Sequence, residues 1–199
     1  MSQSPVAVRR LVLASTSLYR RELLGRLGLP FECARPETDE TPLRDEPPAK
    51  TAMRLAAAKA SAVRERFPDS LAIGSDQVAS CQGRRLDKPG THEKAVAQLT
   101  FLSGRTAVFD TAVCLLDTLT GRAETRVVLC KVHFRRMDAV RVEAYLRREQ
   151  PYDCAGSAKA EGLGIALIER IETDDPTSLI GLPLIALTGL LEAFGLSPV

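Results

Sequence analysis

The chain has 199 residues, of which 45% are hydrophobic, 26% charged and 5% aromatic. This composition is typical of a globular protein and excludes intrinsic disorder. Its 27 lysines and arginines nearly balance 25 aspartates and glutamates, which leaves a net charge of +2. A nucleic-acid-binding protein needs a dominant basic field, so we expect no nucleic-acid partner. Any anionic ligand must be bound by a local cluster of basic residues.

Cysteine and histidine usage excludes several further classes. The chain has two histidines, far apart, and this excludes a His-rich zinc centre. The five cysteines are widely spaced, odd in number and never in a C-x-x-C pair. This pattern predicts reduced, mostly buried thiols and a cytoplasmic location.

Neither a membrane span nor a signal peptide is expected. The most apolar stretch, residues 182–191, is shorter than the roughly 20 residues that a membrane span needs. The first ten residues are too short and too polar for a signal peptide. Residues 1–9 are expected to form a flexible terminus.

Apolar runs and helical spacing predict alternating strands and helices along the chain. The first half is expected to hold a strand at 11–14, a helix at 18–27, a strand at 31–34, a polar loop at 35–48, a helix at 49–67 and a strand at 71–74. The second half is expected to hold a turn at 82–83, a helix at 91–102, a hairpin of strands at 107–117 and 125–134, a helix at 138–148, a loop at 151–164, a strand at 165–171 and a helix at 183–194. Hairpins and helical crossovers together predict an α/β fold with a mixed sheet.

A hydroxyl-rich turn joins the first predicted strand to the first helix. Ser15, Thr16 and Ser17 form this turn, and Arg20 follows in the first helical turn. Helix N–H groups, hydroxyls and a guanidinium together suit an anion. The same residues also fit a capped helix with a solvated arginine.

Three carboxylates lie close together in the proline-bounded loop: Glu37, Asp39 and Glu40. Such a cluster can hold a hard divalent cation, although an acidic loop can equally be solvated. Asp76 follows the apolar strand at 71–74, and ligands of open α/β sheets bind at strand ends. A carboxylate there can accept a proton from water or can form an Asx turn.

Two lysines complete the set. Lys59 lies on the long helix and Lys88 precedes Pro89. Each can neutralise a phosphate as a point charge, or can be an ordinary surface residue. Basic groups for phosphates, carboxylates for a metal and one carboxylate for water are the components of metal-assisted polyphosphate hydrolysis.

Seven segments, in this order, resemble the signature motifs of the Maf family of nucleotide pyrophosphatases. They are A-S-T-S-L-Y-R-R-E-L-L at 14–24, P-E-T-D-E-T at 36–41, R-L-A-A-A-K-A at 54–60, I-G-S-D-Q-V at 73–78, D-K-P at 87–89, A-G-S-A-K-A-E-G-L-G at 155–164 and L-I-G-L-P-L at 179–184. The resemblance covers residues 10–194. It implies one domain over residues 10–199, with a mixed twisted sheet, flanking helices and two lobes around a central cleft.

The resemblance also implies an activity and its residues. Family members are enzymes that depend on a divalent cation, here Mg²⁺ or Mn²⁺. They cleave between the α- and β-phosphates of a nucleoside triphosphate and release pyrophosphate. By position, the phosphate-binding residues are Ser17, Arg20, Lys59 and Lys88. Glu40 and Asp76 are implied at the metal, and Asp76 is also the implied proton acceptor. A homodimer is a family-level expectation.

Three positions concern the base: Tyr19, Gln77 and Glu161. This set resembles the branch of the family assigned to 7-methyl-GTP and differs from the members that act on dTTP and UTP. 7-Methylguanine is cationic, so Glu161 can accept hydrogen bonds from its N1–H and 2-amino groups. Tyr19, at a position where that branch often has Trp, can stack on the cationic ring.

The leading hypothesis is therefore a 7-methyl-GTP pyrophosphatase. One alternative is a pyrophosphatase for dTTP, UTP or another modified nucleotide. The other is a non-catalytic, nucleotide-binding regulator of cell division. In every case the expected partner is a nucleotide, and no membrane partner is expected.

Overall fold

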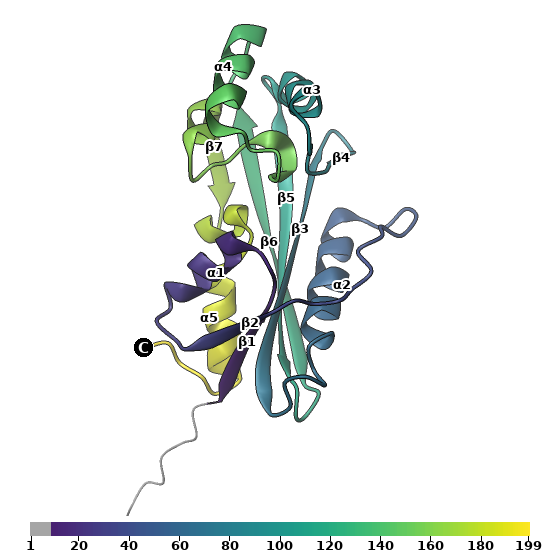
Figure 1. The fold of residues 1–199 in the computed structure, drawn as a ribbon, viewed down its shortest axis with the longest axis vertical. Helices are drawn as coiled ribbons and strands as arrows, with labels where there is room; N and C mark the ends of the chain where they lie inside the picture. Colours follow the sequence, from purple (N-terminus) through teal and green to yellow (C-terminus); the bar gives the residue numbers. More distant parts are fainter. Residues whose placement is uncertain (1–8) are drawn as a thin grey trace, which may run out of the picture.

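The computed structural model describes residues 9–199, in which helices and strands alternate in the predicted order. The strands are β1 (Arg10–Ala14), β2 (Phe31–Ala34), β3 (Ser70–Cys81), β4 (Arg84–Leu86), β5 (Thr106–Asp117), β6 (Ala123–Phe134) and β7 (Ile168–Thr173). The helices are α1 (Leu18–Gly25), α2 (Pro48–Ser61), α3 (His92–Leu102), α4 (Ala139–Glu149) and α5 (Leu184–Ala193) (Figure 1). Short 3₁₀-helices occupy η1 (Ala155–Ser157), η2 (Leu163–Leu167) and η3 (Pro176–Ile180). Across this described part, no helix is both long and apolar enough to cross a bilayer.

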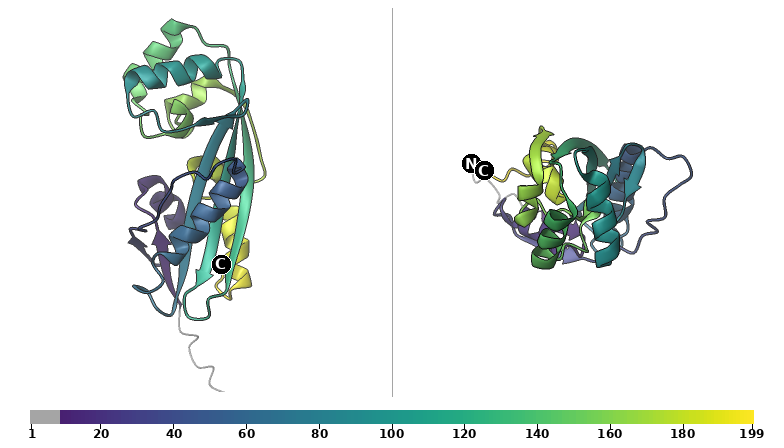
Figure 2. Two further views of the ribbon diagram at one scale, coloured as in Figure 1. Left: turned by 90° about the vertical axis from the view of Figure 1, so that its right-hand side faces the viewer. Right: turned by 90° about the horizontal axis from the view of Figure 1, so that it is seen from above.

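The strands form one mixed sheet in the order β2-β1-β3-β5-β6-β7, with β4 added to β3. β1 pairs in parallel with β2 and β3, whereas β3, β5, β6 and β7 are joined by antiparallel pairing. This confirms the predicted mixed α/β fold. β3, β5 and β6 have 12 residues each, and they run from the lower to the upper part of the molecule (Figure 2).

Separate apolar cores cover different parts of this sheet. In the lower lobe, α1 and α5 pack on one face of β3 with Leu71 and Ile73, and α2 packs on the other face with Ala72. In the upper lobe, α3 and α4 pack around Leu99 and Leu146. Figure 1 shows the two groups of helices at opposite ends of the long strands. The same strands therefore support both lobes.

α2 approaches β3 unusually closely at Gly74. A Cβ atom built on Gly74 would lie 2.0 Å from the carbonyl oxygen of Ala56 and 2.6 Å from the nitrogen of Ala60. Only glycine fits there, because any side chain would strike the backbone of the helix. Lys59 precedes Ala60 on this helix, so the close contact places Lys59 beside the middle of β3.

Three predicted element boundaries are wrong. α2 ends at Ser61 instead of residue 67, because the Arg64 N–H donates to the carbonyl three residues back and tightens the helix into turns. β7 begins at Ile168 instead of residue 165, because η2 winds closely past Lys159; a Cβ on Gly164 would lie 2.5 Å from the Lys159 carbonyl oxygen. β3 continues to Cys81 instead of ending at residue 74, because β5 pairs with it from Leu71 to Ser80.

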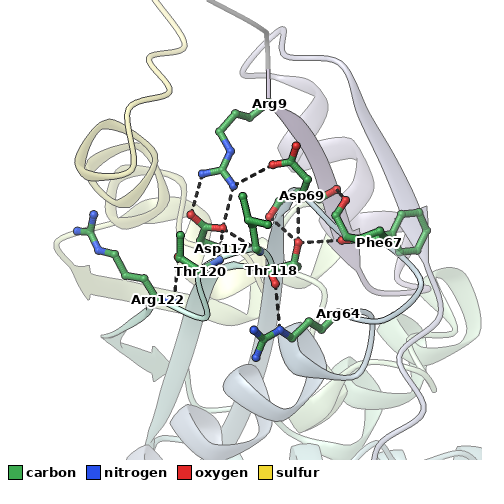
Figure 3. A network of polar contacts seen from close by, with 11 residues as sticks. Arg9, Arg64, Phe67, Asp69, Asp117, Thr118, Thr120 and Arg122 are labelled. Atoms are coloured by element: carbon green, nitrogen blue, oxygen red, sulfur yellow. Dashed lines mark hydrogen bonds and ion pairs between the residues drawn. The ribbon is translucent and has the colours of Figure 1, made fainter.

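A polar network closes the lower end of the sheet (Figure 3). The Arg9 guanidinium donates to both carboxylate oxygens of Asp117, at 2.9 and 2.8 Å. The same carboxylate accepts the N–H groups of Leu119 and Thr120. The bond from Arg9 is the main reason that the pKa of Asp117 lies well below its usual value. Residues 1–9 were expected to be flexible. Residues 1–8 lie outside the described residues, and Arg9 is held by this network.

The cysteines differ in their burial. All five cysteines are free; Cys81, Cys114 and Cys130 are buried, Cys154 is half-buried and Cys33 is exposed.

Candidate active site

A cavity of about 860 Å³ lies beside β3, between residues of the lower and upper lobes. The turn before α1, the loop after β2 and Lys59 of α2 form its lower part. Phe109 of β5 and residues 153–161 form its upper part. The nine residues to which the family resemblance gave a role all line this cavity: Ser17, Tyr19, Arg20, Glu40, Lys59, Asp76, Gln77, Lys88 and Glu161.

The cavity is located where β3 has an open edge. β1 pairs with β3 only as far as Ile73, and β4 pairs with β3 only from Ala79 onward. Among the described strands, none pairs with this edge of β3 between those two residues. Asp76 was expected at a strand end, and it lies instead in the middle of β3. The strand end at this point belongs to β1, whose pairing with β3 stops at Ile73. The expectation that β3 itself ends before Asp76 was therefore wrong.

Lys59 joins two carboxylates at the lower end of the cavity. Its Nζ lies 2.6 Å from Asp76 Oδ1 and 2.8 Å from Glu40 Oε1. The side chains of Lys59 and Asp76 are 7% and 10% exposed, and that of Glu40 is 59% exposed. Burial acts to raise the pKa of Glu40, but Lys59, Arg20 and Lys88 together bring it below its usual value. Glu40 is therefore ionised at neutral pH.

The side chain of Arg20 is held by the carbonyl of Gly181, the residue that follows η3. Its Nε donates to the Gly181 oxygen at 2.8 Å, and the Ser75 hydroxyl donates to the same oxygen at 2.9 Å. Burial lowers the pKa of Arg20, while Asp76 and Glu40 act to raise it; an arginine remains charged at any physiological pH. Because Nε is bonded to the protein, the terminal nitrogens are the atoms that can reach a ligand.

Ser17, one of the three hydroxyl residues of the predicted turn, is the N-cap of α1. Its hydroxyl accepts the N–H of Arg20 at 3.4 Å, and its own N–H donates to the Ser15 hydroxyl at 3.1 Å. The turn before α1 thus presents hydroxyls and helix N–H groups to the cavity, an arrangement suited to an anion.

Gln77 points to the opposite face of β3 from Asp76. Its Nε2 donates to the Thr111 hydroxyl at 2.9 Å and to the carbonyls of Ser178 and Leu179 at 2.9 and 3.1 Å. The amide nitrogen of Gln77 therefore fixes η3 against the sheet. A direct role in choosing the base stays a prediction.

The upper end of the cavity carries an aromatic ring and further charges. The Lys159 Nζ lies 5.5 Å from the centre of the Tyr19 ring and 3.6 Å from Glu149 Oε1. Glu161 is exposed and lines the same end. Burial, reinforced by Asp153, raises the pKa of the Cys154 thiol to about 12. A thiol that is protonated at neutral pH is a poor nucleophile.

The acidic loop contributes a single carboxylate to the cavity. Glu40 lines it, whereas Glu37 and Asp39 do not; Asp39 accepts the N–H of Thr41 at 2.9 Å. Within residues 9–199 no group of three or more His, Cys, Asp or Glu side chains is placed to hold a metal ion. Glu40 and Asp76 offer hard oxygen ligands, and Mg²⁺ in nucleotide enzymes is commonly bound by one or two carboxylates plus substrate phosphates. The donor set therefore fits such a cation.

Three supporting residues were missed by the sequence analysis. Lys159 stands two positions before Glu161 in the same motif, which was a usable signal. Ser75 and Thr111 act on Gly181 and Ser178, which are 106 and 67 positions away. No local pattern can reveal contacts at such separations.

Comparison with known proteins defines the class. The model of the family described as "Maf-like protein" matches residues 10–194, and the chain belongs to the Maf family. A protein of Cupriavidus metallidurans named 7-methyl-GTP pyrophosphatase is 56% identical over 185 residues, which cover 93% of each chain. A protein of the same name from Burkholderia thailandensis is 54% identical over 198 residues, 98% of this chain and 92% of that one. A solved HAM1 protein from Coxiella burnetii covers 65% of this chain and 74% of that one, with 15% identity and a TM-score of 0.43, too distant to add to the functional argument.

Proposed function

We propose that this Maf protein hydrolyses 7-methyl-GTP to 7-methyl-GMP and pyrophosphate, with a divalent cation, in the cytoplasm. One observation carries the proposal. A single cavity joins three basic side chains, Arg20, Lys59 and Lys88, and two carboxylates at one end to Tyr19 and Glu161 at the other. The relatives named 7-methyl-GTP pyrophosphatase support this choice of substrate.

The lower end of the cavity binds the triphosphate in this proposal. Arg20 presents its terminal nitrogens, and Lys88, which is exposed and lines the same cavity, adds an ammonium. Ser17 and the first N–H groups of α1 add neutral donors. These groups hold the phosphates in place before the reaction, which removes much of its entropic cost.

Asp76 accepts the proton of the attacking water. Its Oδ1 accepts a hydrogen bond from the Lys59 ammonium at 2.6 Å. The side chain is 10% exposed, and water can reach it only from the cavity. A carboxylate in this position can generate the nucleophile at the phosphorus.

Glu40 and Asp76 are the residues that would hold the divalent cation. When bound, such a cation neutralises the charge that develops on the phosphates. The basic residues around the two carboxylates supply the rest of that stabilisation.

The upper end of the cavity binds the base. Glu161 can form a charge-assisted pair with the cationic 7-methylguanine, and the Tyr19 ring can stack on it. The Lys159 ammonium, 5.5 Å from the centre of that ring, would have to withdraw before a cationic base could stack there, because like charges repel.

A panel of nucleoside triphosphates tests the function directly. With Mg²⁺ or Mn²⁺ present, pyrophosphate release should be fastest from 7-methyl-GTP and slower from GTP, UTP and dTTP. Chelation of the metal should abolish it. A preference for UTP or dTTP would favour the pyrimidine alternative, and saturable binding without pyrophosphate release would favour a non-catalytic regulator.

Replacing Glu161 with glutamine should lower kcat/KM for 7-methyl-GTP by about tenfold or more, because a charged acceptor is replaced by a neutral one. The effect on UTP should be smaller. Steady-state kinetics on both substrates checks this, with Glu169→Gln, an exposed glutamate on β7, as the matched control. Equal losses on both substrates would refute the role of Glu161 in selecting the base.

A further inference from the structure

The Lys59 ammonium occupies the position between the two carboxylates of the cavity. It lies 2.6 Å from Asp76 Oδ1 and 2.8 Å from Glu40 Oε1, and its side chain is 7% exposed. Those are the same two carboxylates whose oxygens suit a divalent cation. An ammonium and a metal ion meet a similar electrostatic need here, since each places positive charge between two carboxylates, one unit for the ammonium and two for a divalent cation.

We propose that Lys59 is the resident counterion of the cation site, and that a divalent cation binds between Glu40 and Asp76 only when a triphosphate draws the ammonium away. The inference rests on the proposed function, because it takes the triphosphate as the ligand. It adds an order to binding: the cation enters together with the nucleotide.

The charges around the site support this order. A divalent ion placed beside the Lys59 ammonium would be repelled at short range in a partly buried site. Arg20 and Lys88 line the same cavity and add to its positive potential. In the absence of a nucleotide, the cavity should therefore disfavour a metal ion, even though it contains two carboxylates.

The number of ligands supports it as well. The protein supplies two carboxylates, and among residues 9–199 no third His, Cys, Asp or Glu joins them. A triphosphate supplies what is missing in two ways. Its oxygens can complete the coordination of the cation, and they can accept hydrogen bonds from Lys59.

The side chain of Lys59 can move from the carboxylates to a triphosphate while its backbone stays in place. Its backbone is fixed, because α2 is pressed against Gly74 of β3 one residue further along the helix. Its side chain is a flexible four-carbon stem with a point charge at the tip. The ammonium can therefore change partners without any movement of the helix.

Binding of Mn²⁺ to the protein without nucleotide tests the proposal. Electron paramagnetic resonance of free Mn²⁺ would be used to compare wild type, Lys59→Met and Lys50→Met. Lys50 is an exposed lysine on the same helix, so its variant controls for net charge. Lys59→Met should bind Mn²⁺ at least about tenfold more tightly than the other two, because a nearby unit charge is removed.

Two additions make the result specific. The double variant Lys59→Met/Asp76→Asn should lose the gain, because one of the two carboxylates is neutral. An α,β-methylene analogue of the triphosphate should raise the Mn²⁺ affinity of wild type more than that of Lys59→Met, after correction for Mn²⁺ bound by the analogue alone.

Equal Mn²⁺ affinity in wild type and Lys59→Met would overturn the proposal, and so would tight binding by wild type without nucleotide. Melting temperatures establish that each variant is folded; if Lys59→Met is not, Lys59→Gln takes its place. The experiment measures Mn²⁺ binding and does not depend on hydrolysis of a nucleotide. A protein that leaves 7-methyl-GTP intact would refute the proposed function, whereas unchanged Mn²⁺ affinity would refute only the role of Lys59.

Discussion

Replacing Asp76 with asparagine will lower pyrophosphate release by about a hundredfold or more, in the range expected for loss of a general base. Asparagine has nearly the same size, and its side-chain oxygen can still accept the hydrogen bond from Lys59. It cannot take a proton from water. The measurement is kcat on 7-methyl-GTP at saturating Mg²⁺, together with circular dichroism and the melting temperature of the variant.

An exposed aspartate that no hydrogen bond or ion pair engages in the described structure, Asp174, provides the matched control. Asp174→Asn should keep wild-type turnover. Near-normal turnover in a folded Asp76→Asn protein would remove Asp76 from the mechanism. If KM rose while kcat stayed unchanged, the residue would be a binding group and not the base.

Replacing Gly74 with alanine will destabilise the protein by about 3 kcal/mol or more, a size reserved for severe packing errors. The new methyl group would lie 2.0 Å from the Ala56 carbonyl oxygen and 2.6 Å from the Ala60 nitrogen. Both are backbone atoms, so relief requires the whole helix α2 to move. That movement would also carry Lys59 away from Asp76, and activity should fall with stability.

Urea unfolding followed by circular dichroism measures the first effect. Gly25→Ala is the matched control, because a Cβ built at Gly25 in α1 meets nothing within 4 Å. That change should leave stability unchanged or slightly higher, since alanine is the better helix former. A Gly74→Ala protein as stable as wild type would show that α2 is not held against β3 as described.

The sequence was most informative where local patterns are strong. The hairpin of β5 and β6 has long apolar strands around a glycine turn, and it was predicted to within about two residues. The alanine-rich run from residue 49 predicted the helix α2, although the helix ends at Ser61. The residues of the cavity were also identified from the sequence, but mainly through the family motifs: Arg20, Lys59 and Asp76 would each have been ambiguous alone.

Features that depend on other strands could not be predicted. Asp76 becomes accessible because β1 ends beside the middle of β3, and nothing near residue 76 encodes the length of β1. The amide of Gln77 is bonded to Ser178 and Leu179, which lie about half the chain away. Pairing partners of this kind are a property of the assembled sheet, so a local reading of the motif could assign Gln77 only to the ligand.

The three long strands that pass through both lobes limit how the enzyme can respond to its substrate. Closing the lobes on a nucleotide would require β3, β5 and β6 to bend together, against continuous ladders of hydrogen bonds. We therefore expect the distance between the base end and the phosphate end of the cavity to change little on binding, so that adjustment to a nucleotide falls to side chains and loops.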